Sequence, residues 1–337
     1  MRVAYTDPAW ALDGDGRVDA SLADVEREVY GDGVDVTLGV RDDGRWVLDG
    51  DRLHEHVAGA DALVVYRCQV TPELLDAAGP QCRVVARQGV GLDNLNIPLL
   101  REASRYGFHV PDYCGDEVST HTLALLLGLE RGVCVQDRLV KANAWSIHAG
   151  GVPRRVCERT AGIVGFGRIG RASSRKLGVF YQRVLAYDPY VPGDLMASFG
   201  VGHVETLAEL FERCDAVVVH AELTPETQNL IGAGALRSAR PGALLVNTAR
   251  GKLVDPSAVL GALREGRLGG FASDVFSPED PNEDEVTRAL LERDDVIVSA
   301  HRAFLSAESE RSLRRRVAEG VAHVLRRDEP PQLGRVA

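Results

Sequence analysis

The sequence predicts an α/β protein built from two doubly wound parallel sheets. Three observations favour this fold class. Short runs rich in β-branched residues alternate with helix-like segments in the first third of the chain, and a second alternation follows residue 115. The length of 337 residues is sufficient for two domains with separate cores. Repetition of strand and then helix predicts parallel sheets covered by helices.

The first block contains five expected strands, at residues 2–7, 34–40, 62–67, 83–89 and 108–113. Between them, the segments SLADVEREVYG and TPELLDAAG have suitable N-caps and closing glycines, so each predicts a helix. The apolar segment GDEVSTHTLALLLGLERGV then predicts one long helix that links two lobes. The final segment DEPPQLGRVA is expected to be loose.

The second block contains six expected strands, at residues 160–166, 184–188, 216–221, 243–249, 270–276 and 295–300. The segments that separate them are long enough for helical crossovers. Six strands with such connections predict a doubly wound sheet.

A glycine-rich turn follows the first strand of this second block. Gly165, Gly167 and Gly170 have G-x-G-x-x-G spacing, and Asp188 lies 18 residues beyond Gly170 after another strand. The glycines allow a tight turn, close approach of a pyrophosphate, and close packing of helix on strand. Asp188 would accept hydrogen bonds from ribose hydroxyls and repel a 2′-phosphate. The context therefore predicts a Rossmann domain that binds NAD in preference to NADP.

Three ionisable residues follow successive strands of the second block. Arg250 follows ALLVNTA, Glu279 follows GFASDVF after a short loop, and His301 follows DVIVSA. Ligands of open α/β sheets bind beyond the carboxyl ends of the strands. A guanidinium, a carboxylate and an imidazole at that edge predict a site that clamps an anionic substrate and transfers a proton. Each residue alone could equally have a structural role.

Composition excludes several classes of protein. A formal net charge of −10 argues against direct binding of nucleic acid. The basic run at 311–316 is interleaved with other residues at helical spacing, which predicts the solvated face of a terminal helix. Six cysteines without a C-x-x-C pair suggest neither a metal site nor disulfides. We expect no membrane contact and a cytoplasmic location, and the bias of 36 arginines to three lysines suggests a bacterial source.

The motifs GIVGFGRIG, VNTARG and DVFSPE, followed by the histidine after the last strand, resemble those of D-isomer-specific 2-hydroxyacid dehydrogenases. The resemblance covers roughly residues 60 to 330. Within the family, RQGVGLDN, PDYCGDEVSTHTLALLL and HRAFLSAES are similar to the branch that includes the C-terminal-binding proteins.

The resemblance implies a fold and a domain arrangement. A flavodoxin-like substrate-binding domain would comprise residues 1–112 and 302–337, and an inserted Rossmann NAD domain would comprise 113–301, with the active site in the cleft between them. It also implies a homodimer. Trp145, in the unassigned segment 139–155, would be a plausible interface anchor.

The resemblance also implies roles for individual residues. His301 matches the acid/base residue, Glu279 the carboxylate that pairs with it, and Arg250 the residue that binds the substrate carboxylate and carbonyl. Backbone amides of Val90 and Gly91 would complete the carboxylate site. The expected cofactor-binding residues are Gly165, Gly167, Arg168, Ile169, Gly170, Asp188, Thr224, Thr248, Ala249, Asp274 and Thr122.

The chain departs from the family pattern around the histidine and the cofactor. Ala300, Arg302 and Phe304 stand where a proline, an apolar or small residue, and a small residue are usual, Glu222 replaces a proline, and Tyr181 replaces a glycine. Arg302 either points to solvent or pairs with Glu308, or it supplies a second cation for a doubly anionic substrate such as a dicarboxylate or a phosphonate.

Three functions fit these observations. The first is an NAD-dependent oxidoreductase that transfers a hydride between nicotinamide and a small (R)-2-hydroxy or 2-oxo acid. The second is an NADH-sensing binding protein of the corepressor type, which would not need all of Arg250, Glu279 and His301. The third is a dehydrogenase of a phosphonate- or phosphate-bearing hydroxy compound.

Overall fold

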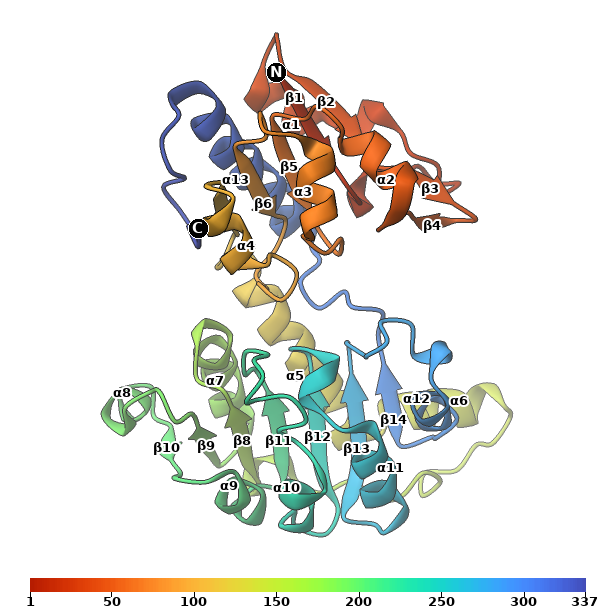
Figure 1. The fold of residues 1–337 in the computed structure, drawn as a ribbon. Helices are drawn as coiled ribbons and strands as arrows, with labels where there is room; N and C mark the ends of the chain where they lie inside the picture. The colour runs from red at the N-terminus through yellow and green to blue at the C-terminus, as the bar shows by residue number, and fades with distance from the viewer. The chain divides into compact units, whose positions relative to one another are not determined.

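The computed structural model describes all residues, 1–337, and divides into two compact units. Unit 1 comprises Met1–Tyr113 and Ser306–Ala337, and unit 2 comprises Cys114–Leu305. The domain boundaries expected from the sequence fall within four residues of these limits. Each unit is an α/β structure in which helices cover both faces of a parallel sheet (Figure 1).

Unit 1 contains a five-stranded parallel sheet with the order β2-β1-β5-β6-β7. When only the strands of this sheet are numbered in chain order, the order is 2-1-3-4-5, which is the flavodoxin-like arrangement. The strands are β1 (Arg2–Tyr5), β2 (Asp35–Leu38), β5 (Ala62–Val65), β6 (Val84–Arg87) and β7 (Tyr106–Phe108). A short antiparallel hairpin, β3 (Arg41–Asp42) and β4 (Arg45–Trp46), lies outside the sheet.

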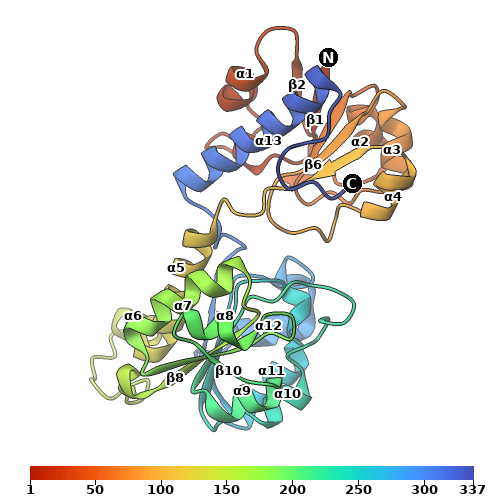
Figure 2. The ribbon, with the colours of Figure 1, turned by 90° about the vertical axis from the view of Figure 1, so that its left-hand side faces the viewer.

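Helices of unit 1 divide between the two faces of its sheet (Figure 2). One face packs against α1 (Asp24–Tyr30) and α13 (Ala307–Arg327). The other packs against α2 (Gly50–Val57), α3 (Pro72–Ala78) and α4 (Ile97–Glu102). Two 3₁₀ helices, η1 (Ala9–Ala11) and η2 (Ala20–Leu22), precede α1. The apolar residues of α13 therefore complete a core that the N-terminal segment begins.

Unit 2 contains a seven-stranded parallel sheet with the order β10-β9-β8-β11-β12-β13-β14. The first six strands have the relative order 3-2-1-4-5-6, which is the Rossmann arrangement. The strands are β8 (Thr160–Val164), β9 (Arg183–Tyr187), β10 (Gly202–His203), β11 (Ala216–Val219), β12 (Ala243–Asn247), β13 (Leu268–Ser273) and β14 (Val296–Val298). The doubly wound fold class expected from the sequence is confirmed for both sheets.

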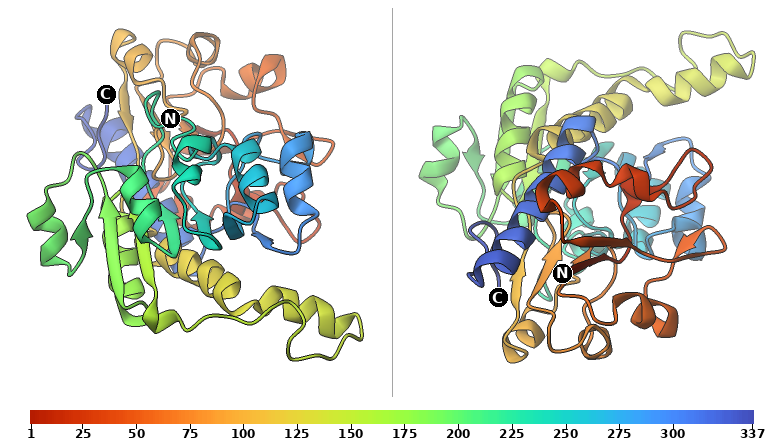
Figure 3. Two further views of the ribbon diagram at one scale, coloured as in Figure 1. Left: turned by 90° about the horizontal axis from the view of Figure 1, so that it is seen from below. Right: turned by 90° about the horizontal axis from the view of Figure 1, so that it is seen from above.

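One face of the unit 2 sheet packs against α5 (Gly115–Arg131), α7 (Arg168–Phe180) and α8 (Gly193–Ser198). The other packs against α9 (Leu207–Arg213), α10 (Ala233–Arg237), α11 (Pro256–Arg264) and α12 (Glu285–Leu291). Three 3₁₀ helices complete the unit: η3 (Val156–Glu158), η4 (Gly251–Leu253) and η5 (Pro281–Glu283). Helix α6 (Val133–Lys141) and the loop after it project from the edge of unit 2 (Figure 3).

Three expectations are corrected at the ends of elements. The strand expected at 108–113 lies earlier, as β7 at Tyr106–Phe108, and the next amide, His109 N, donates to Gly334 O of the C-terminal tail at 3.0 Å. The long helix ends at Arg131, where Gly132 adopts a left-handed conformation with φ of 59°. The tail is not loose, since Val336 N donates to Gly107 O at 2.8 Å and Arg335 forms an antiparallel bridge with Phe108.

The basic run in α13 is only partly solvated. Arg314 is largely buried, with its side chain 11% exposed, and it forms a bidentate pair with the fully buried Glu26 at 3.0 and 2.6 Å. Its guanidinium also lies over the Trp10 ring, 4.0 Å from the centroid. Arg314 is thus a core ion-pair residue, which the surface interpretation missed.

No single helix is long and apolar enough to cross a bilayer, although the bent pair α5 and α6 meets the criterion by length and composition alone.

Candidate active site

The glycine-rich turn connects β8 to α7 at the carboxyl edge of the unit 2 sheet. Gly165 has φ of +90°, and a Cβ there would lie 2.5 Å from Ala221 N. A Cβ on Gly170 would lie 2.2 Å from Gly165 O, so this glycine allows the helix to pack closely on the turn. Gly167 is the N-cap of α7 and faces open space. The turn therefore leaves exposed backbone at a helix N-terminus, where a pyrophosphate would be bound.

Asp188 lies directly beside this turn, as expected. Its Oδ2 accepts a hydrogen bond from Phe166 N at 2.7 Å, and its Oδ1 accepts one from Tyr190 N at 2.9 Å. Each carboxylate oxygen retains a further lone pair that can accept from a ribose hydroxyl. Arg168 is exposed and Ile169 half-buried at the start of α7. These residues fit an NAD adenosine and pyrophosphate.

The three predicted threonines lie in three different segments of unit 2. Thr122 in α5 and Thr248 after β12 are both buried, and their hydroxyl oxygens lie 2.7 Å apart. Thr248 precedes Ala249, whose amide donates to Asn247 Oδ1 at 3.1 Å. Thr224, after β11, forms a closed turn in which its amide donates to Thr227 Oγ1 at 2.7 Å.

Asp274 holds the turn that carries His301. It is buried, with 1% of its surface exposed, and directly follows β13. Its Oδ1 accepts from Ser299 Oγ at 2.5 Å and from Arg302 N at 3.0 Å, and its Oδ2 accepts from Ala303 N at 2.8 Å. The Asp274 carbonyl accepts from His301 N at 2.7 Å. Asp274 is thus a positioning residue for this turn.

His301 and Glu279 are in direct contact. His301 Nδ1 lies 2.5 Å from Glu279 Oε1, while no protein group is bonded to Nε2. His301 has a left-handed φ of 48°, which is stabilised by the hydrogen bonds that Asp274 accepts from the His301, Arg302 and Ala303 amides. The Phe304 ring packs edge-on against the imidazole at a centroid distance of 6.4 Å. Glu279 therefore fixes the orientation of the imidazole through Nδ1, and Nε2 is left open to a ligand.

Arg250 lies after β12, the strand next to β13 in the sheet. The buried Asn247 holds its turn, since Asn247 Nδ2 donates to Arg250 O at 2.9 Å. Gly251 is required beside it, because a Cβ there would lie 2.2 Å from the Phe276 carbonyl carbon. Arg250, Glu279 and His301 consequently lie along one edge of the sheet, after the three neighbouring strands β12, β13 and β14.

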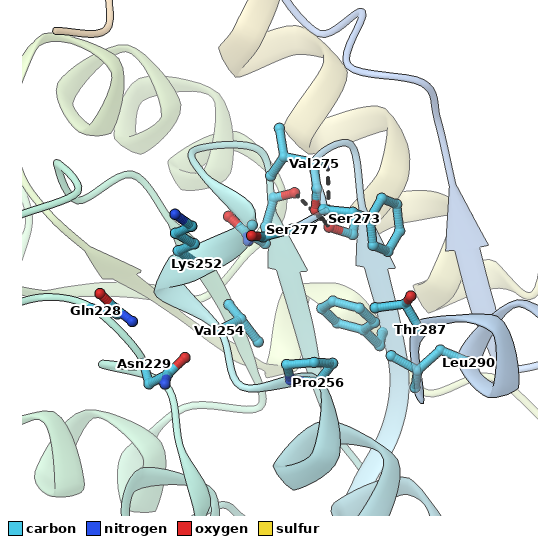
Figure 4. A pocket seen from close by; sticks show the side chains of 14 residues that line it. Gln228, Asn229, Lys252, Val254, Pro256, Ser273, Val275, Ser277, Thr287 and Leu290 are labelled. Carbon is cyan, nitrogen blue, oxygen red and sulfur yellow. Dashed lines mark hydrogen bonds between the residues drawn. The ribbon is translucent and has the colours of Figure 1, made fainter. Parts of the chain in front are cut away.

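A cavity of about 220 Å³ lies behind the Arg250 turn (Figure 4). Lys252, Gln228 and Asn229 line it on one side, and Ser273 lies within it with its hydroxyl bonded to Val275 O at 2.7 Å. None of Arg250, Glu279 and His301 lines this cavity. It is therefore separate from the predicted catalytic groups.

The remaining predicted residues are Val90 and Gly91 in unit 1 and Arg302 in unit 2. The Val90 carbonyl accepts a hydrogen bond from the His109 ring at 2.6 Å, which holds this loop. The amides of Val90 and Gly91 donate no hydrogen bond within unit 1, so both are available to an anion. The exposed guanidinium of Arg302 makes no hydrogen bond within unit 2.

Sequence reasoning missed several residues that support the site. Ser299 bridges Asp274 and His121, whose Nε2 lies 2.8 Å from Ser299 Oγ. His220, after β11, is bonded through Nε2 to Ser173 Oγ at 2.8 Å, and burial lowers the pKa of His220 to about 3. For Ser299 and His220 the available signal was a polar side chain directly after an apolar strand, whereas His121 lies within α5 and gave no such signal.

Residues 123–303 match the model of the D-isomer specific 2-hydroxyacid dehydrogenase family, NAD binding domain. An (S)-sulfolactate dehydrogenase of Chromohalobacter salexigens is 36% identical over 294 residues, which cover 86% of this chain and 90% of the relative. A D-3-phosphoglycerate dehydrogenase of Methanocaldococcus jannaschii is 32% identical over 281 residues, covering 83% of this chain and 52% of the relative. The chain thus spans about half the length of the phosphoglycerate dehydrogenases that it matches.

The fold is also that of a solved D-lactate dehydrogenase from Aquifex aeolicus, complexed with NAD and lactic acid. That structure has a TM-score of 0.83 and 23% identity, and the match covers 97% of this chain and 96% of the other. The chain belongs to the D-isomer specific 2-hydroxyacid dehydrogenase family, and its unit 2 contains the NAD-binding domain of that family.

Proposed function

We propose that this protein is an NAD-dependent oxidoreductase that interconverts a small (R)-2-hydroxy acid and the corresponding 2-oxo acid. The observation that carries the proposal is the contact of 2.5 Å between His301 Nδ1 and Glu279 Oε1. A carboxylate behind one imidazole nitrogen fixes the ring and leaves the other nitrogen to exchange a proton with a ligand.

The proposed chemistry assigns one task to each side chain. Bound NAD supplies the hydride acceptor. His301 Nε2 takes the hydroxyl proton of the 2-hydroxy acid as the C2 hydrogen leaves as hydride, and it returns the proton in the reverse direction. Arg250 binds the substrate carboxylate and stabilises negative charge on the reacting oxygen. Val90 and Gly91 contribute amide donors to the carboxylate.

We further propose that the cofactor contacts the glycine-rich turn through Gly165, Gly167 and Gly170. Asp188 binds the ribose, and its charge disfavours a 2′-phosphate. Thr122, Thr248 and Asp274 would lie beside the nicotinamide. The available lone pairs of Asp188 and the open space above Gly167 support this assignment.

A more specific proposal for the substrate is a 2-hydroxy acid that carries a second anionic group. The guanidinium of Arg302 is exposed and unengaged within unit 2, immediately after His301. Relatives of the chain are named for sulfolactate and phosphoglycerate, which both carry a second acid. We propose that Arg302 binds such a group. Replacement of Arg302 by Ala should then reduce kcat/KM about tenfold for dianionic acids and leave monoanionic acids unaffected. An equal effect on both classes would contradict this role.

A homodimer is proposed through the loop after α6. Trp145, Ile147 and Val152 are 86%, 84% and 76% exposed, and so large an apolar surface is typical of an interaction site. Sedimentation of the parent and of Trp145→Ser tests this, because loss of the anchor should shift the population to monomer. The cytoplasmic location, the bacterial source and the lack of a nucleic-acid or membrane partner remain predictions.

The decisive experiment measures NADH oxidation with a panel of 2-oxo acids and their phosphonate analogues. We expect turnover on one class, and a fall in kcat of about 10²–10⁴-fold in His301→Ala with NADH affinity retained. Glu279→Gln should lose less, because it keeps a hydrogen-bond acceptor for Nδ1. His203→Ala, which replaces an exposed histidine of the edge strand β10, is the matched control and should behave as the parent. NADH binding without turnover on any acid would overturn the proposal and favour the NADH-sensing alternative.

A further inference from the structure

A second charged cavity lies at the amino edge of the unit 2 sheet, opposite to the glycine-rich turn. It has a volume of about 570 Å³, and residues that precede or begin β8, β9, β11 and β12 line it. The strands are parallel, so their carboxyl ends, with the turn at Gly165, lie at the other edge (Figure 1). The cavity is therefore distinct from the dinucleotide site.

Five arginines line this cavity: Arg154, Arg155, Arg159, Arg183 and Arg240. Only two carboxylates, those of Glu158 and Asp215, line it with them. Glu158 pairs with Arg155 at 2.8 Å, and Asp215 lies 3.5 Å from Arg240. Arg154 and Arg183 are exposed and form no ion pair. The cavity thus concentrates positive charge in a chain whose net charge is −10.

Arg159 forms the buried wall of the cavity, with its side chain 10% exposed. It is held from behind by Glu130, whose other oxygen accepts a hydrogen bond from the Tyr181 hydroxyl at 2.6 Å. Arg159 also donates to the Asp215 carbonyl at 2.9 Å. Its Nε is nevertheless buried without a hydrogen-bond partner. A guanidinium fixed in this way retains an unsatisfied donor, which is costly unless a ligand accepts it.

The chemistry of the lining restricts the ligand. All nine lining residues are charged or polar, so the site offers mainly polar surface and little that would select an aliphatic or aromatic group. Guanidinium groups match phosphate oxygens with two parallel hydrogen bonds, and the volume is in the range of small-molecule sites. A long nucleic acid would be opposed by the net charge of −10 that the chain carries.

We propose that this cavity binds a small phosphate-bearing polyanion, in which Arg154 and Arg183 supply the free cations and Arg159 the fixed donor. The site is independent of the proposed dehydrogenase activity. Tyr181, which stands where the family usually has glycine, contributes to it by orienting Glu130 and, through Glu130, Arg159.

Calorimetric titration with inorganic pyrophosphate tests the proposal, in protein saturated with NADH so that the dinucleotide site is filled. We expect saturable binding of one pyrophosphate per chain that weakens as the salt concentration rises. The double variant Arg154→Ala/Arg183→Ala should bind roughly tenfold more weakly or worse. Both side chains are exposed and unpaired, so the variant retains its fold. Arg264→Ala, an exposed arginine of α11, is the matched control and should bind as the parent does.

Two outcomes would overturn the proposal. The first is an unchanged dissociation constant in the double variant, or no saturable binding to the parent protein. The second is binding of citrate as tight as that of pyrophosphate, since the cavity would then respond to charge alone and not to phosphate. Unchanged NADH oxidation in the double variant would confirm that the site is separate from the active site.

Discussion

Replacement of Asp274 by Asn should loosen the turn that carries His301. The parent carboxylate accepts three hydrogen bonds, from Ser299 Oγ, Arg302 N and Ala303 N. An amide offers only one oxygen. The less costly orientation keeps that oxygen at the Oδ1 position and turns the NH₂ group toward Ala303 N, so that two donors face each other.

The magnitude follows from these contacts. One charge-assisted bond is lost, at about 1.5–3 kcal/mol, and the two that remain become neutral bonds of roughly half the strength. The lower cost of burying a neutral amide offsets part of this loss. We therefore expect the free energy of unfolding of unit 2 to fall by about 2–4 kcal/mol. Ser299→Ala removes one donor only and should cost about 1–2 kcal/mol.

Hydrogen exchange is the assay that locates the effect, because the amides of Arg302 and Ala303 are themselves the donors. Their exchange should accelerate strongly in Asp274→Asn and less in Ser299→Ala, while the amides of β8 remain protected. Urea unfolding provides the corresponding free energies. Unchanged exchange at both amides, together with a free energy of unfolding within about 0.5 kcal/mol of the parent, would refute the reasoning.

Two further predictions concern a buried titratable group in each unit. His220 has a pKa lowered by burial to about 3, against an ordinary value of 6.5, so the unfolded chain binds the extra proton between these values. The stability of unit 2 should therefore fall by roughly 1–2 kcal/mol for each pH unit below about 6.5, and thermal melts of His220→Gln should show a shallower dependence on pH. In unit 1, Arg314→Ala should cost about 3–5 kcal/mol because it leaves Glu26 charged and buried; addition of Glu26→Gln should restore most of that loss in urea titrations, and an unrestored double variant would contradict the ion-pair account.

Most of the architecture was predictable from local patterns. Buried parallel strands are continuous apolar runs, and AVVV in β11 and ALLVN in β12 are unmistakable in the sequence. The hairpin of β3 and β4 was missed because each strand has two residues, although its turn residues Asp43 and Gly44 are typical of a tight hairpin turn. The tail pairs with β7 through backbone groups, and a sequence pattern carries no signal for such pairing.

The candidate site was predictable to the level of strand ends. Arg250, Glu279 and His301 were singled out because each is a charged or titratable group beyond a buried strand, and their roles in the site stay predictions. The support behind them was not predictable. Ser299 and His121 meet across 178 positions of sequence, and only the packed structure of α5 against β14 brings them together.

Helix α13 has a consequence for biosynthesis. Its side chains Leu313, Val317 and Val321 belong to the same core as Val3 and Tyr5 of β1, so the unit that begins the chain is closed by residues translated some 300 positions later. Unit 2 has all its strands between those two segments and can fold on emerging from the ribosome. Until α13 is synthesised, α1 alone covers that apolar face of the first sheet, which makes it the part of the nascent chain most in need of protection by a chaperone.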